Sequence, residues 1–161
     1  MKKSTIAILA VVAVIVVWAI AGYNGLVSKE ESVNQTWANV ESAYQRRMDL
    51  IPNLVNTVKG YAEHEKETLQ AVTDARTKAT SINIDPSTAT PEQMEAWMSA
   101  QHSMSSALGR LIAVSESYPE LKANENFRDL QAQLEGTENR IKVERDRYNA
   151  AVKEYNVKIR R

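Results

Sequence analysis

The chain has 161 residues, which is enough for one domain with its own core and too few for two. It holds 20 lysines and arginines against 20 aspartates and glutamates, so it lacks the basic excess of a nucleic-acid-binding protein, and we expect no nucleic-acid partner. It has no cysteine, which excludes disulfides, thiolate metal sites and cysteine nucleophiles.

An uncharged segment covers residues 6–27. As a helix it would be about 33 Å long, enough to cross a hydrocarbon core of about 30 Å. A cleaved signal peptide is the alternative, because Ala19-Ile20-Ala21 fits the small-x-small rule, but the apolar run continues past that point. We therefore expect residues 1–27 to be a retained transmembrane anchor that contacts lipid through residues 6–27, and residues 28–161 to form a helical-bundle domain.

The charges that flank this segment predict its orientation. Lys2 and Lys3 precede it, and Lys29, Glu30 and Glu31 follow it. The positive-inside rule then places the N-terminus in the cytoplasm and the bundle outside it. We expect a single-pass protein of the cytoplasmic membrane.

The apolar and aromatic positions from Val33 to Ala62 recur at steps of three and four residues, with a mean near the α-helical period of 3.6. The pattern fades near Thr80, so we expect one helix over residues 28–80. Residues 81–90, "SINIDPSTAT", have the composition of a loop.

Two further helices follow. Thr90, Pro91 and Gln93 predict a capping box at the start of the first, which should stop before Pro119. Asn124 is a good N-cap for the second. No segment alternates with period two, so the sequence predicts an all-α protein: a transmembrane helix running into an antiparallel bundle of long helices.

Pro52 allows two architectures. The first helix could continue through it with a bend, which gives three long helices and makes Pro52 a hinge. Alternatively the chain could reverse near Asp49, with Pro52 in the first turn of a new helix, which gives four helices. The continuous helix is favoured, because the apolar phase passes through Pro52 without a slip.

A helix over residues 28–80 would be too long for the later helices to cover. Its membrane-proximal half would then expose an apolar stripe, and a second copy of the chain could bury it. We therefore expect a homo-oligomer that assembles through Val33, Trp37, Val40 and Tyr44.

Several motifs together resemble the LemA family of small bacterial membrane proteins. They are Tyr23-Asn24, Trp37, "YQRRMDLIPNL" (44–54), Val58, Tyr61, Glu65, "YPELKAN" (118–124), Phe127, "LQAQLEGTENRI" (130–141), Arg145, Tyr148-Asn149 and Tyr155-Asn156. The resemblance covers nearly the whole chain. It implies an N-terminal membrane helix followed by an antiparallel bundle, usually of four helices, with no established enzymatic activity.

The resemblance also bears on the two ends of the chain. The family is sometimes drawn with its short N-terminus outside the cell, which is opposite to the orientation that the flanking charges predict. Family members tend to continue past the last Tyr-Asn into a Phe-Pro-containing tail, so we expect this chain to be truncated or divergent at that end.

The two strongest motifs predict a polar network between the first and last helices. Guanidinium groups match carboxylates bidentately, and such a network would fix the register of the helices or form a partner surface. Its predicted members are Arg46, Arg47, Asp49, Glu135, Glu138, Asn139 and Arg140.

No catalytic, metal-binding or cofactor-binding constellation is predicted. "HEKET" at His64 lacks the second histidine of a zinc protease, and there is no glycine-rich phosphate loop. We expect no enzymatic activity and no cofactor. The favoured function is a membrane-anchored scaffold or adaptor of the bacterial cell envelope that acts through self-assembly or an unidentified envelope protein. The alternative is an accessory factor to a membrane protease or an envelope-stress signalling system.

Overall fold

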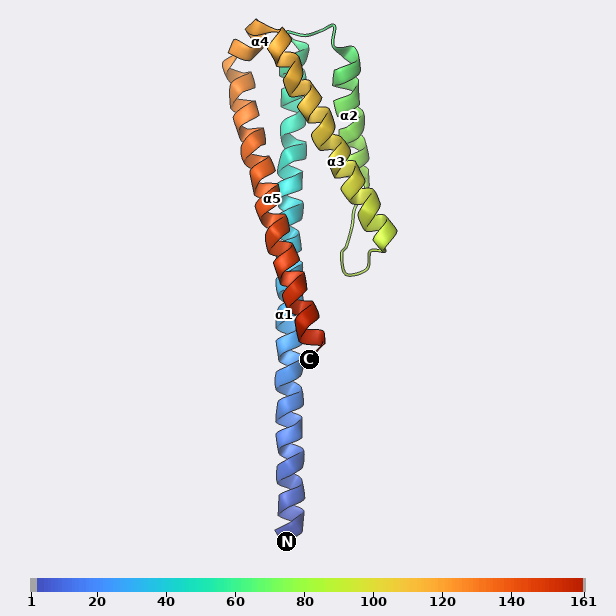
Figure 1. The fold of residues 1–161 in the computed structure, drawn as a ribbon, viewed down its shortest axis with the longest axis vertical. Helices are drawn as coiled ribbons and strands as arrows, with labels where there is room; N and C mark the ends of the chain where they lie inside the picture. The colour runs from blue at the N-terminus through green and yellow to red at the C-terminus, as the bar shows by residue number, and fades with distance from the viewer. Residues whose placement is uncertain (1–2, 161) are drawn as a thin grey trace. The chain divides into compact units, whose positions relative to one another are not determined.

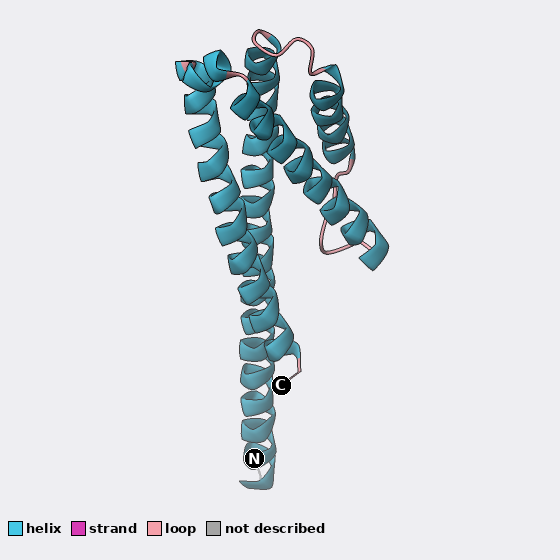
Figure 2. Cartoon of the chain, turned by 45° about the horizontal axis from the view of Figure 1, so that its top comes forward, coloured by secondary structure: helices cyan, strands magenta, loops and turns pink. Residues whose placement is uncertain are grey.

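The computed structural model describes the backbone of residues 3–160 and the side chains of residues 6–160, and this part of the chain is helical without a strand. The helices are α1 (Lys3–Lys59), α2 (Lys66–Ser81), α3 (Pro91–Val114), the short 3₁₀ helix η1 (Ser115–Ser117), α4 (Pro119–Ala123) and α5 (Glu125–Ile159) (Figures 1 and 2). The all-α prediction is confirmed.

The chain forms two compact units, which cut across the predicted division at residue 27. One unit comprises residues 1–40 and 143–161, and the other comprises residues 41–142. Both α1 and α5 therefore contribute to each unit. The first unit holds the apolar segment, and α1 is the described helix that is long and apolar enough to cross a membrane.

The second unit is a four-helix bundle made of residues 41–59 of α1, α2, α3 and residues 125–142 of α5. Its apolar core is contributed by all four helices and by α4. Ile51, Leu54 and Val58 of α1 meet residues such as Val72, Met104 and Phe127, all at most 1% exposed. Helices α2 and α3 lie side by side (Figure 1).

The predicted helix over residues 28–80 is wrong at one point, because α1 ends at Lys59 and the chain reverses in residues 60–65. The amide of Gly60 donates to the carbonyls of Asn56 and Thr57, and the amide of Ala62 donates to that of Val58 at 2.8 Å. Glycine is about 1 kcal/mol less favourable than alanine in a helix interior. Ala62 is buried although it lies in the turn, so the apolar period continues past the end of the helix. The periodicity therefore does not indicate the reversal.

The favoured continuous helix through Pro52 is confirmed and the alternative reversal near Asp49 does not occur, since α1 continues through Pro52 with the proline exposed. Pro52 has no N–H for the carbonyl of Met48, four residues earlier. Nε of Arg76 on α2 donates to that carbonyl at 3.1 Å. An arginine from the neighbouring helix thus replaces the donor that the proline removes, while the role of Pro52 as a hinge stays a prediction.

The early reversal also changes what covers the stripe that was expected to drive oligomerisation. Trp37, Val40 and Tyr44 are buried within the chain, at 7%, 1% and 7% exposure, and Val33 is half-buried. In the unit that holds Trp37, α5 lies along α1, with the Tyr148 ring against Trp37 and Lys158 beside Gly25. The uncovered strip is therefore absent, and the homo-oligomer stays a prediction without an assigned surface.

The predicted helix ends are confirmed. Thr90 and Gln93 form the capping box of α3, with the Gln93 amide 3.2 Å from Oγ1 of Thr90 and the Thr90 amide 2.8 Å from Oε1 of Gln93. Oδ1 of Asn124 accepts the Phe127 amide at 2.9 Å at the start of α5. The five-residue α4 between Pro119 and Ala123 was not predicted.

The replacement of the missing donor by Arg76 can be tested with a double-mutant cycle. Arg76→Met should lower the free energy of unfolding by about 1–3 kcal/mol, because the Met48 carbonyl loses its donor. In the Pro52→Ala background the restored amide binds that carbonyl, so the same substitution should cost much less. Chemical denaturation measures both values, with Lys78→Met on the exposed side of α2 as control. An equal cost of Arg76→Met in both backgrounds would show that the two residues are not linked.

Candidate functional site

Arg47 is the largest side chain that the bundle buries completely, at 1% exposure. It lies on α1 between Tyr44 and Ile51, at steps of three and four, so the helical period turns it toward the core. A guanidinium ion carries five N–H donors and needs acceptors when it leaves water. Its surroundings therefore define the first candidate site.

Three residues from two other helices supply those acceptors. Nη1 of Arg47 donates to Oε1 of Glu138 on α5 at 2.9 Å and to Oγ of Ser105 on α3 at 2.7 Å. Nη2 donates to Oε1 of Gln101 at 2.6 Å and to the Gln101 carbonyl at 3.2 Å. The Tyr44 ring lies 5.0 Å from the guanidinium carbon and packs edge-on against Trp97. We call Arg47, Gln101, Ser105 and Glu138 the Arg47 cluster.

The Arg47 cluster fixes three helices to one another. Glu138 is 39% exposed, so its charge stays partly hydrated while it pairs with a buried cation. Such a pair adds little net stability, because desolvation offsets most of the Coulomb attraction. It does penalise arrangements in which the guanidinium loses its acceptors, so it selects one register of α1, α3 and α5.

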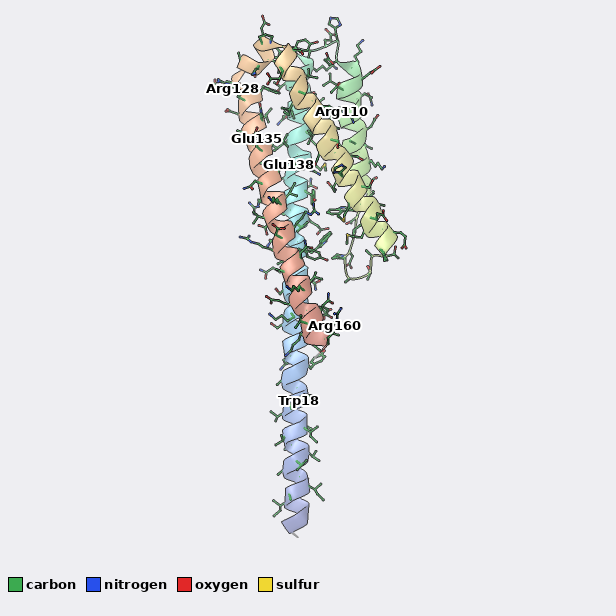
Figure 3. All side chains as sticks on the ribbon, viewed as in Figure 1. Trp18, Arg110, Arg128, Glu135, Glu138 and Arg160 are labelled. Carbon is green, nitrogen blue, oxygen red and sulfur yellow. The ribbon has the colours of Figure 1, made fainter. Side chains whose placement is uncertain are left out.

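Of the predicted polar network, the structure brings together only Arg47 and Glu138. Arg46 reaches α5 separately and donates to Oε1 of Gln133 at 3.0 Å. Asp49 and Glu135 accept hydrogen bonds within their own helices, from Gln45 and Gln131. Asn139 and Arg140 are exposed on α5, as is Glu135, which Figure 3 labels together with Glu138.

Gln101 and Ser105 are not among the predicted members of the network, although the sequence carries a signal for Gln101. Trp97, Gln101, Met104 and Leu108 follow one another at steps of four, three and four, so Gln101 is a polar residue in the apolar stripe of α3. Arg47 interrupts the stripe of α1 in the same way. Polar residues at core positions of two helices are candidates for pairing with each other.

A second polar cluster ties the turn at residues 60–65 to the segment around α4. Oη of Tyr118 donates to Oε1 of Glu65 at 3.1 Å, and Nδ2 of Asn124 donates to Oη of Tyr61 at 2.9 Å. Burial raises the pKa of the Tyr118 phenol, and the Glu65 carboxylate raises that pKa further. Four residues that carry the family resemblance thus join two connections of the bundle.

In the first unit, residues of α1 and α5 pack through aromatic rings. Trp37 and Tyr148 have ring centroids 5.1 Å apart, and burial raises the pKa of the Tyr148 phenol. Glu144, which is 5% exposed, accepts a hydrogen bond from Arg147 through Oε1, while its Oε2 has no hydrogen-bond partner among the described residues.

The geometry of these clusters suits holding helices together. Arg47, with both Nη groups engaged by acceptors on α3 and α5, serves as a fixed cation between these helices. His64 and His102 are exposed, in the 60–65 turn and on α3. Within residues 3–160 no group of three or more His, Asp or Glu side chains is placed to hold a metal ion.

A double-mutant cycle tests the Arg47–Glu138 pair. Glu138→Leu leaves the buried guanidinium without its carboxylate and should cost about 1.5–3 kcal/mol of unfolding free energy. Arg47→Leu strands Glu138 and Gln101, so the double variant should cost less than the sum of the two single variants. Arg46→Leu combined with Glu138→Leu is the control and should be additive, since Arg46 binds Gln133. Additivity of the Arg47 and Glu138 changes would show that the pair does not couple.

Comparison with known proteins places these features in a family. The model of the LemA family matches residues 36–161. The magnetosome protein MamQ 2 of Paramagnetospirillum magneticum is 30% identical over 96% of this chain and 62% of its own length. The protein LemA of Metamycoplasma hominis is 24% identical over 84% of this chain and 58% of its own length. The chain thus spans about three fifths of the length of the curated relatives it matches. The family match covers both polar clusters and the whole of the bundle, and on that basis the chain belongs to the LemA family.

Proposed function

We propose that this chain is a membrane-anchored, non-catalytic scaffold or adaptor of the bacterial cell envelope, whose bundle binds a partner protein or a second copy. The anchor would be the apolar segment of α1, which leads into the bundle without a break in the helix. The names of its relatives, magnetosome proteins and a LemA protein, describe no reaction.

One observation carries this proposal: the motif "LEGTENRI" on α5 has two different faces. Its inward residues serve the bundle, since Leu134, Thr137 and Ile141 are buried and Glu138 binds Arg47. Its outward residues Glu135, Asn139 and Arg140 are exposed. The motif thus extends to positions that the packing of the bundle does not require, and a partner surface gives them a role.

The orientation of the anchor is a separate part of the proposal. Lys2 lies outside the described residues and the side chain of Lys3 is not described, so the placement of the bundle outside the cytoplasm rests on sequence alone. Fusions of alkaline phosphatase and of a fluorescent protein after Arg161 report the side of the membrane. Fluorescence without phosphatase activity would reverse the orientation.

Photocrosslinking in intact cells tests the partner surface. Benzoylphenylalanine at Glu135, Asn139 or Arg140 should give one common adduct, which mass spectrometry identifies as a second copy or an envelope protein. The same residue at the exposed positions Asp74 and Lys78 of α2 is the matched control and should not give it.

A charge reversal makes this experiment decisive. Arg140→Glu should abolish the adduct formed from position 135, because it changes the charge of the proposed surface, while helicity stays unchanged. Adducts that form equally from α2 and α5, or that survive the charge reversal, would contradict a specific surface on α5.

A further inference from the structure

The last turns of α5 lie beside the end of the apolar segment of α1. A β-carbon built on Gly25 would lie 3.1 Å from Cε and 3.3 Å from Nζ of Lys158, and Nζ of Lys29 is 2.6 Å from Oε2 of Glu154. Trp37 meets Tyr148 further along, so the two helices run antiparallel here. Figure 3 labels Arg160 at the end of α5 and Trp18 on the part of α1 that continues beyond it.

This arrangement brings basic residues to the level at which the span ends. The uncharged segment runs to Val27, so Lys158 beside Gly25 is level with its last residues. Arg160 lies about 3 Å further toward the span, because α5 is antiparallel to α1. Both side chains are exposed, as is Lys153 one to two turns earlier on α5.

The nearby acidic charges only partly compensate this group. Glu154 is paired with Lys29, whose hydrogen bond and charge hold the pKa of the Glu154 carboxyl below its usual value. Glu30 and Glu31 are exposed about 8–9 Å beyond Gly25 along α1, further from the span than Lys158 and Arg160. The side of this region that faces the span is therefore cationic.

The same tip exposes apolar side chains that suit a membrane interface. Val157 is 43% exposed and Ile159 is 54% exposed, next to the two cations. Long basic side chains can keep their charge at the headgroups while their stems lie along apolar surface. Val157 and Lys158 also line an open groove with Lys29, Lys153 and Glu154.

We propose that the end of α5, with Lys153, Lys158 and Arg160, binds the anionic headgroups of the lipids that surround the anchor. Basic residues beside a membrane span are attracted to acidic lipids. Each such residue near the surface raises the binding constant by about five-fold. The covalent anchor holds the tip at the headgroup layer, so a weak individual contact suffices. The end of α5 is thereby tied to the membrane as well as to α1.

Full-length chain reconstituted in vesicles tests this lipid contact. The chain has no cysteine, so Val157→Cys carries a single fluorophore. Quenching by a headgroup spin-labelled lipid is compared in phosphatidylcholine and in an equal mixture with phosphatidylglycerol. We expect stronger quenching with phosphatidylglycerol, and a return to the phosphatidylcholine level at high salt. Inorganic phosphate should not compete beyond its effect on ionic strength.

Two variants with equal charge change locate the effect. Lys158→Gln with Arg160→Gln should remove the phosphatidylglycerol dependence, corresponding to a loss of about 25-fold in lipid binding. Lys142→Gln with Arg145→Gln changes two exposed residues of the same helix, about 20 Å or more from the tip, and should retain it. Equal quenching of the wild type in both lipids, or equal behaviour of the two variants, would overturn the proposal.

This inference rests on the proposed membrane anchoring, and the two can fail separately. A chain that alkaline carbonate extracts from the membrane would refute the anchor itself. A chain that resists extraction but shows no dependence on phosphatidylglycerol would refute only the lipid contact.

Discussion

The bundle of residues 41–142 depends on a buried guanidinium. Arg47 reaches the core at 1% exposure, where an unpaired cation would be very costly, so its acceptors must stay in place. Those acceptors belong to α3 and α5, and their positions along each helix are fixed by the planar guanidinium. Apolar stripes that repeat every three or four residues tolerate a shift by one turn, whereas this cluster does not.

A second constraint is the place where α1 ends. The reversal at residues 60–65 lets α2 contribute to the core and brings Tyr61 to Asn124, the residue before α5. Within the other unit, the last turns of α5 lie along α1, with Lys158 beside Gly25. Trp37 is buried against Tyr148 for the same reason, which removes the apolar strip that a later reversal would have left exposed.

The sequence predicted those features that depend on short-range chemistry. The capping box of α3 can be predicted from Thr90, Pro91 and Gln93 alone. The helix that is able to cross a membrane can be predicted from the length of the 22-residue uncharged segment. The sequence-based prediction of where α1 ends was wrong, because the apolar period and the glycine at position 60 indicated different things. At Gly60 the apolar period continued to Ala62 while the helix did not, because a buried residue in a turn satisfies the same period.

Two of the four residues of the Arg47 cluster, Arg47 and Glu138, were predicted from the sequence, and Gln101 and Ser105 were not. Charge in the two motifs predicts a role for Arg47 and Glu138, but charge alone does not distinguish them from Arg46, Asp49 and Glu135. The position of each residue on the apolar stripe makes that distinction, and it also identifies Gln101. Bonds that join distant segments, such as Arg76 to Met48, depend on the tertiary arrangement and have no local signal.

The central claim is that Arg47 sets the register of α1 against α3 and α5. Pulsed electron–electron double resonance, which measures distances between spin labels, tests it directly. The full-length chain has no cysteine, so Glu41→Cys on α1 and Asp129→Cys on α5 carry the only two spin labels, both at exposed positions. We expect one narrow distance distribution in this labelled chain. Adding Arg47→Met should broaden it or add a population displaced by about 5 Å, one helical turn, while helicity is retained. An unchanged narrow distribution in the Arg47→Met chain would show that apolar packing alone sets the register, and would contradict the role given to Arg47.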